Sequence, residues 1–66
     1  MQPTLGQTYV SARDPALRIS IKGVQAIGNE FFVVSIVTDD DTIVHEMDDE
    51  EWAALVEHYA LIPVLR

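Results

Sequence analysis

The stretch MDDEEWAALVEHYA, residues 47–60, decides the fold because it predicts a helix in a chain otherwise rich in β-prone segments. Asp48 fits the N-cap position, and Glu51, three residues later, completes a carboxylate version of the capping box. Met47 before the cap and Trp52 after it have the spacing of a hydrophobic staple. We therefore expect a helix to begin after Asp48, with its acidic first turn at the positive end of the helix dipole.

The same stretch predicts one apolar helix face. Apolar residues recur at helical spacing, at Trp52, Leu55, Val56, Tyr59 and Ala60. Because proline cannot continue a helix, Pro63 predicts that the helix ends near Leu61. We expect an amphipathic helix of about three turns, with Trp52 buried as the anchor between the helix and a sheet.

Two β-prone segments near the beginning of the chain predict the first two strands. Residues 7–12 form a short run that ends before Pro15. In residues 17–22 apolar side chains alternate with polar ones, which is the period of a strand with one solvated face. At Gly23 this alternation slips in phase, which predicts a bulge or a sharp bend in a curved sheet.

Residues 30–38 predict a third strand that is apolar on both faces. A tight hairpin of type II′ at Gly28 and Asn29 is expected to join it to the second strand. Such a strand is central in a two-layer structure, or its second face is covered by a helix or by another chain. One face carries Phe32, Val34 and Ile36, and the other carries Phe31, Val33 and Val37.

A second hairpin and a short last strand complete the predicted sheet. Residues 39–41 predict a polar turn, and residues 42–47 predict the fourth strand. After the helix, the apolar residues 62–65 predict a short edge strand. In the fourth strand we expect Thr42 and Glu46 to face outward. The side chains expected to face the core are Ile43, His45 and Met47.

These elements predict a single domain over residues 1–66, mainly β with one helix (α+β), in the order of four strands, the helix and a short strand. The small curved antiparallel sheet either packs the helix on one face or closes into a partial barrel. The Gly-x-x-Tyr opening at residues 6–9 and the late aromatic helix near Pro63 resemble the small SH3-like barrels of uncharacterised bacterial families. The resemblance implies an SH3-like partial barrel. This chain departs from that plan by having a full helix, rather than a single 3₁₀ turn, before its last strand.

Composition argues against several classes of protein. Four Lys and Arg against eleven Asp and Glu give a net charge of −7, which disfavours direct binding of nucleic acid or of anionic membranes. The chain has no cysteine, and therefore no disulfide, thiolate metal site or thiol nucleophile. No apolar run approaches the roughly 20 residues of a membrane span, and the first residues lack a signal-peptide pattern. We expect a cytoplasmic protein.

Eight of the eleven acidic residues fall between positions 39 and 51. They either solvate a turn and cap the helix, or they form an acidic face that attracts a basic partner. The span 39–50 is not a calcium-binding loop, because Val44 occupies the position that requires glycine. The candidate residues of an acidic partner-binding face are Asp39, Asp40, Asp41, Glu46, Asp49 and Glu50.

No pattern in the sequence predicts catalysis, a cofactor or a resident metal. The serines at positions 11, 20 and 35 lie in predicted strands without a nucleophile motif. His45 and His58 lack the spacing of metal ligands. We expect His45 to be half-buried and satisfied by a neighbouring residue, and His58 to be solvated.

The leading functional hypothesis is a non-enzymatic, acidic interaction module that binds another protein, with a basic partner if the acids form a face, and that forms a homodimer. Its self-association surface is predicted at Phe31, Val33, Val37 and Val64, because a chain this short leaves apolar residues uncovered. Two alternatives stay open: a nucleic-acid mimic whose carboxylates occupy a cationic site, and a small metal-dependent enzyme that uses His45 or His58. A mimic needs its acids spread over one face, whereas a capped helix gathers them around one end.

Overall fold

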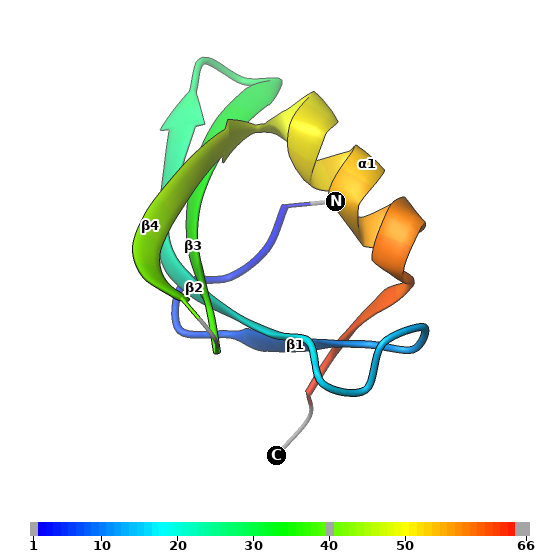
Figure 1. The fold of residues 1–66 in the computed structure, drawn as a ribbon. Helices are drawn as coiled ribbons and strands as arrows, with labels where there is room; N and C mark the ends of the chain where they lie inside the picture. Colours follow the sequence, from blue (N-terminus) through cyan, green and yellow to red (C-terminus); the bar gives the residue numbers. More distant parts are fainter. Residues whose placement is uncertain (1, 40, 65–66) are drawn as a thin grey trace.

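The computed structural model of the chain describes residues 2–39 and 41–64, which form one five-stranded antiparallel sheet and one helix (Figure 1). Neighbouring strands follow the order β4-β3-β2-β1-β5, so β4 and β5 are the two edges of an open sheet in this part of the chain. The predicted fold class, mainly β with one helix before a short last strand, is confirmed. The elements are β1 (Thr8–Ser11), β2 (Arg18–Ile27), β3 (Phe31–Thr38), β4 (Asp41–Asp48), α1 (Asp49–Tyr59) and β5 (Leu61–Pro63).

The core lies on the concave face of the sheet. Figure 1 shows the sheet curving strongly, with α1 lying across its open side. Because side chains alternate between the two faces of a strand, alternate residues of β1, of the first half of β2 and of β3 are buried in this core. Trp52 enters this core from α1 and is 2% exposed, which confirms its predicted burial. The buried apolar residues are Tyr9, Ile19, Ile21, Phe32, Val34, Ile36, Trp52 and Leu61.

The start of α1 has the predicted capping box. The backbone N–H of Glu51 donates to Asp48 Oδ1 at 2.8 Å, and the backbone N–H of Asp48 donates to Glu51 Oε1 at 3.2 Å. Met47, on the other side of the cap, packs partly buried against the core. The cap determines at which residue the helix begins, and so determines which side chain of its first turn points into the core. That side chain is Trp52.

The helix ends at Tyr59, and Ala60 is its C-cap. The sequence pattern placed Ala60 in the apolar stripe of the helix, one residue too far. Ala60 has a φ of 50°, a left-handed conformation that is disfavoured by roughly 1–2 kcal/mol for a residue with a Cβ atom. The connection requires this conformation because β5 begins at the next residue and returns along β1. No helix in the described part of the chain is long and apolar enough to cross a membrane.

The short strand β5 pairs antiparallel with β1, with Pro63 opposite Tyr9 and Leu61 opposite Ser11. This confirms the predicted edge strand, although β5 begins one residue before the predicted segment 62–65. Position 65 lies outside the described residues. Proline suits this strand because an edge leaves one side of its backbone without ladder hydrogen bonds.

The irregularity predicted at Gly23 is confirmed. The pairing of β2 with β3 shifts register between Ile21 and Gly23, which leaves Lys22 as the extra residue of β2. Bulges of this kind bend a strand and increase its twist. The irregularity before Gly23 therefore contributes to the curvature of the sheet that Figure 1 shows.

The hairpin between β2 and β3 differs from the prediction. Ile27 pairs with Phe31, so the loop contains the three residues 28–30 and the predicted two-residue type II′ turn was wrong. The pairing of a β-branched side chain with an aromatic one stabilises this register and leaves Glu30 in the loop. Gly28 has a φ of 66°, a conformation that favours glycine.

The prediction that Ile43 faces the core was wrong, because this residue is 63% exposed. A register shift between Ile36 and Thr38 sets three residues of β4 opposite a single residue of β3. The shift interrupts the alternation on which the prediction depended. After the shift the predicted phase returns, so His45 lies opposite Ile36 and Met47 is partly buried.

Ser11 connects three parts of the chain that the sequence does not relate. Its hydroxyl donates to the carbonyl of Tyr59 at 2.6 Å and accepts the backbone N–H groups of Arg13 at 3.1 Å and Asp14 at 3.0 Å. A serine hydroxyl has one donor and two acceptor sites, so all three are used. Ser11 is 5% exposed and ties the end of β1 and its following turn to the end of α1.

Candidate binding surfaces

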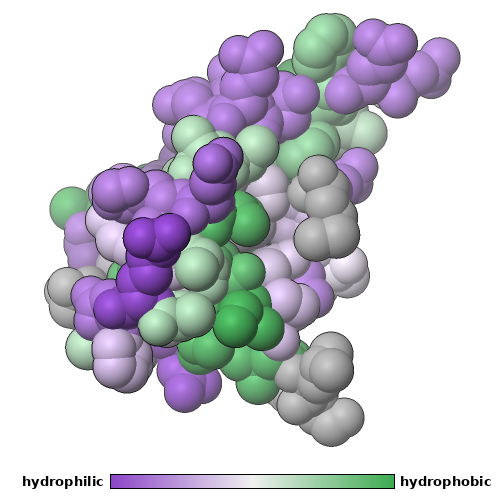
Figure 2. Space-filling view, turned by 90° about the vertical axis from the view of Figure 1, so that its right-hand side faces the viewer, coloured by the Kyte–Doolittle hydropathy of each residue, from purple (hydrophilic) through white to green (hydrophobic). Residues whose placement is uncertain are grey.

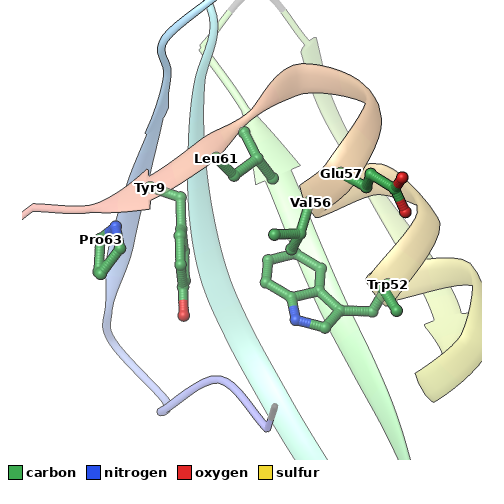
Figure 3. Close-up of a pocket in the computed structure, with 7 residues that line it drawn as sticks. Tyr9, Trp52, Val56, Glu57, Leu61 and Pro63 are labelled. Atoms are coloured by element: carbon green, nitrogen blue, oxygen red, sulfur yellow. The ribbon is translucent and has the colours of Figure 1, made fainter.

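A pocket of about 190 Å³ opens between α1 on one side and strands β1 and β5 on the other (Figure 3). Tyr9 and Pro63 stand on the strand side in Figure 3, and Trp52 and Val56 project from the helix. The pairing of β1 with β5 places Pro63 beside Tyr9, and a spacing of four residues places Trp52 and Val56 on one helix face. The pocket is lined by Tyr9, Trp52, Ala53, Val56, Glu57, Leu61 and Pro63.

Two aromatic rings form the inner wall of this pocket. Tyr9 and Trp52 meet edge to face, with ring centroids 5.2 Å apart, an arrangement that aromatic pairs prefer. The Tyr9 hydroxyl donates to Gln7 Oε1 at 2.8 Å. Burial raises the pKa of Tyr9 above its ordinary value, so the phenol stays neutral at physiological pH. The wall is therefore uncharged and held from both β1 and α1.

The rim of the pocket is acidic, whereas its interior is apolar. Glu57 lines the pocket, but Figure 3 shows its carboxylate directed away from the Trp52 and Tyr9 rings. Ala53 follows Glu50 by three residues and precedes Glu57 by four, so all three lie on the same side of α1. Among the described residues that line the pocket, none is a Lys or an Arg.

A second pocket, of about 250 Å³, lies where α1 faces β2, β3 and β4. It is lined by Leu17, Ile19, Ile36, Thr38, His45, Met47, Leu55 and Tyr59. Both pockets are smaller than the roughly 300–1,000 Å³ of usual small-molecule sites. Figure 2, which views the side that carries α1 in Figure 1, shows hydrophobic surface reaching the exterior between hydrophilic side chains. Each opening has the size of a single side chain.

The acidic residues predicted to form one face follow β4 from end to end. Asp39 lies in the turn before β4 and Asp41 is the first residue of β4, whereas Asp49 and Glu50 begin α1 at the other end of that strand. An eight-residue strand separates these ends by roughly 23 Å. Glu46 lies between them on the outer face of the sheet. The structure describes five of the six predicted residues, Asp39, Asp41, Glu46, Asp49 and Glu50, and Asp40 lies outside the described residues.

Several of these acids have partners within the chain. Asp41 accepts the backbone N–H of Ile43 at 2.8 Å and forms a 3.3 Å hydrogen bond with His45 Nε2. The hydrogen bond from Ile43, and after it the one from His45, lowers the pKa of Asp41 because both favour the charged carboxylate. Asp39 pairs with Arg18 at 3.9 Å on the exposed surface. These contacts hold the turn between β3 and β4.

The two histidines lie at separate places in the fold. His45 keeps its predicted inward phase at the rim of the second pocket, with its ring 49% exposed and Asp41 as the neighbour that satisfies it. His58 is exposed, as predicted, and its ring meets Tyr59 edge to face at 4.6 Å. Within residues 2–39 and 41–64, no three His, Asp or Glu side chains gather in a way that could hold a metal ion.

The four residues of the predicted self-association surface share the outer face of the sheet. Val33 and Val37 alternate with the buried residues of β3, and Phe31 is 57% exposed at the strand's beginning. The backbone N–H of Val64 donates to Thr8 at 2.8 Å, which keeps Val64 in register beyond β5. Because α1 covers only the concave face (Figure 1), no described element covers this outer face.

Comparison with known families places the chain. One family model, described as a domain of unknown function (DUF8087), matches residues 3–61. The chain belongs to this family. The DUF8087 span contains six of the seven residues that line the pocket between α1 and β5, and Pro63 follows two residues after its end. No curated protein and no solved structure matches the chain, so the resemblance to SH3-like barrels stays a prediction.

Sequence reasoning missed the pocket in this DUF8087 domain. Tyr9 and Leu61 are far apart in the sequence, and they meet only because β5 pairs with β1. One signal was present: the helix stripe around Trp52 and Val56 is flanked by the small residues Ala53 and Ala54. Small side chains beside a buried aromatic leave space at a helix surface, and the pocket opens at Ala53.

Proposed function

We propose that the chain is a cytoplasmic, non-enzymatic interaction module that binds a basic segment of another protein on the side that carries α1. One observation carries this proposal: an apolar pocket open to solvent is bordered by a helix whose Asp and Glu residues have no Lys or Arg among them. Apolar openings with charged rims are typical of protein–protein contact sites. Because the helix is acidic, it favours a partner surface of positive charge, and this complementarity also speeds association.

The size of the pockets supports a protein partner over a small substrate. An opening of about 190 Å³ takes one side chain, whereas sites for substrates and cofactors are usually larger. The acids give less support to a nucleic-acid mimic. Asp48 and Glu51 cap α1, and Asp41 is engaged by its own turn, so fewer carboxylates are available to imitate a row of phosphates.

Replacing Glu57 by lysine should weaken binding of a labelled peptide of alternating lysine and glycine by about tenfold, as measured by fluorescence anisotropy at low salt. An exposed ion pair contributes roughly 0.2–1 kcal/mol, and charge reversal replaces that attraction with repulsion. Glu30→Lys is the matched control, because Glu30 is exposed in the β2–β3 loop and the net charge changes equally. Equal weakening by both variants would contradict a binding site beside α1.

The proposal includes self-association through the outer face of the sheet. Phe31, Val33, Val37 and Val64 lie on this face, and two-fold pairing lets one surface serve both copies. Glu46 lies on the same face at the β4 edge, so like-charge repulsion favours a two-fold axis nearer β1 and β2. The α1 side then stays accessible to the basic partner.

Light scattering at tens of micromolar should give twice the chain mass of 7.4 kDa at physiological salt. Val37→Lys places a charge in the middle of the outer face and should return the mass to that of one chain, because a buried unpaired charge is strongly unfavourable. Ala54→Lys, at an exposed residue of α1 on the concave side of the sheet, is the control and should leave the dimer intact. A single-chain mass for the unmodified protein would rule out the dimer.

A further inference from the structure

We propose that the pocket between α1 and β5 takes one benzene-sized apolar side chain from a basic segment of the partner, with Lys or Arg on either side of it. This inference rests on the proposed function and names the chemistry that the site selects. The anchoring side chain enters between the Tyr9 and Val56 walls, and the flanking cations meet the carboxylates along α1.

The volume of the pocket fits one such side chain. A cavity of about 150 Å³ lined by apolar residues is enough to bind benzene, and this pocket has about 190 Å³. Its walls are Tyr9, Trp52, Val56, Leu61 and Pro63, and the carboxylate of Glu57, which also lines the pocket, is turned away from the rings (Figure 3). A phenylalanine or leucine side chain therefore meets apolar surface on several sides.

The pocket is preformed, which favours its use as an anchor site. Tyr9, Trp52 and Leu61 belong to the buried core and come from β1, α1 and β5. Their positions are fixed by packing, so a partner does not have to order them on binding. Anchor residues that dominate interfaces insert into well-packed pockets of this kind.

The carboxylates define what lies beside the anchor. Glu50 and Glu57 flank Ala53 on one side of α1, seven residues apart, which is roughly 10 Å along the helix axis. Ala53 itself lines the pocket. A partner with one cationic residue on each side of its apolar anchor can therefore place one cation near Glu50 and the other near Glu57.

Insertion of Phe31 or Ile43 from a second copy of this chain is unfavourable on charge. The exposed apolar side chains that it could offer include Phe31, which follows Glu30, and Ile43, which lies next to the Asp41 turn. Either insertion would bring carboxylates of one copy toward Glu50 and Glu57 of the other. Like charges across an interface are unfavourable, so the carboxylates of α1 favour an anchor that lies between basic residues over one that lies beside acidic residues.

A pair of labelled peptides tests the inference. One alternates lysine and glycine, and the other has phenylalanine in place of its central glycine. For the unmodified protein, the phenylalanine should strengthen binding about tenfold or more, since burial of a large apolar side chain has an effect of this size. The intrinsic fluorescence of Trp52, the one tryptophan of the chain, should change with the second peptide because Trp52 lines the pocket.

Two variants locate the effect. Ala53→Phe fills the mouth of the pocket from within the chain and should remove the gain from phenylalanine. Ala54→Phe makes the same change at the neighbouring exposed helix residue, which does not line the pocket, and should keep the gain. Circular dichroism checks that both variants are folded. Should Ala53→Phe unfold, Ala53→Leu, with a strong helix former, makes the same test.

The outcomes separate this inference from the proposed function. Equal affinity of the two peptides for the unmodified protein overturns the pocket as an anchor site, while the binding module stands if Glu57→Lys still weakens both. Loss of the gain in Ala54→Phe also overturns the pocket, because the phenylalanine would then bind the helix surface in general. Absence of binding by either peptide contradicts the proposed function itself.

Discussion

Replacing Trp52 by alanine should lower the free energy of unfolding by about 3–5 kcal/mol, as truncation of a buried aromatic does. Trp52 is 2% exposed and its ring packs edge to face on Tyr9 at 5.2 Å. It is also the largest fully buried side chain of the described residues. A domain of this length has a total stability of roughly 3–10 kcal/mol, so the substitution should remove a large share of that stability.

Urea unfolding followed by far-UV circular dichroism measures this loss without depending on the tryptophan signal. Leu5→Ala is the control: it also truncates a large apolar side chain, but one that is 65% exposed, so it should change stability by about 0.5 kcal/mol at most. If Trp52→Ala costs no more than Leu5→Ala, the packing of α1 on the sheet is different from the one described. An emission maximum typical of a solvent-exposed tryptophan in the unmodified protein would contradict the described burial of Trp52 equally.

The start of α1 was predictable from sequence because everything that determines it is local. Asp48 and Glu51 are three residues apart, and each satisfies a backbone N–H of the other. No distant strand can change that arrangement without breaking two hydrogen bonds. Burial of Trp52 follows from it, since the residue after the capping box lies at the beginning of the apolar stripe.

Features that depend on pairing between strands were predicted less well. The exposure of Ile43 arises from a register shift between β3 and β4, and the alternation within residues 42–47 contains no sign of it. The left-handed conformation of Ala60 arises because β5 must begin at once to reach β1. In both cases a contact between distant segments overrides the local pattern.

The candidate sites divide in the same way. The apolar residues Phe31, Val33 and Val37 could be assigned to one face because a period of two is local to β3. The pocket beside α1 could not be predicted, because its walls come from β1, α1 and β5. The six acids looked like one cluster in sequence, yet β4 separates those at its two ends in space.

Replacing Ser11 by alanine should lower the free energy of unfolding by about 1–3 kcal/mol, the usual effect of leaving buried polar groups without partners. The change removes the 2.6 Å bond to the Tyr59 carbonyl and both bonds from the backbone N–H groups of Arg13 and Asp14. Carbonyls in the last turn of a helix have no partner within it. The loss should therefore loosen the end of α1 where it enters β5.

Ser20→Ala is the matched control, because Ser20 is a strand serine on the outer face, opposite Val37, and only half-buried. It should change stability by about 0.5 kcal/mol at most. Hydrogen exchange gives a second readout. Ser11→Ala should speed exchange at Ala12, whose backbone N–H donates to the carbonyl of Ala60 at 3.1 Å, and at Ala60, whose own N–H donates to the carbonyl of Glu57 at 3.3 Å. Exchange at the amides of β3 and β4 should speed up only by the amount that the lower global stability explains, since these strands lie outside this junction. Uniform acceleration over the whole sheet would mean that Ser11 contributes only to global stability and does not hold the junction between β1 and α1.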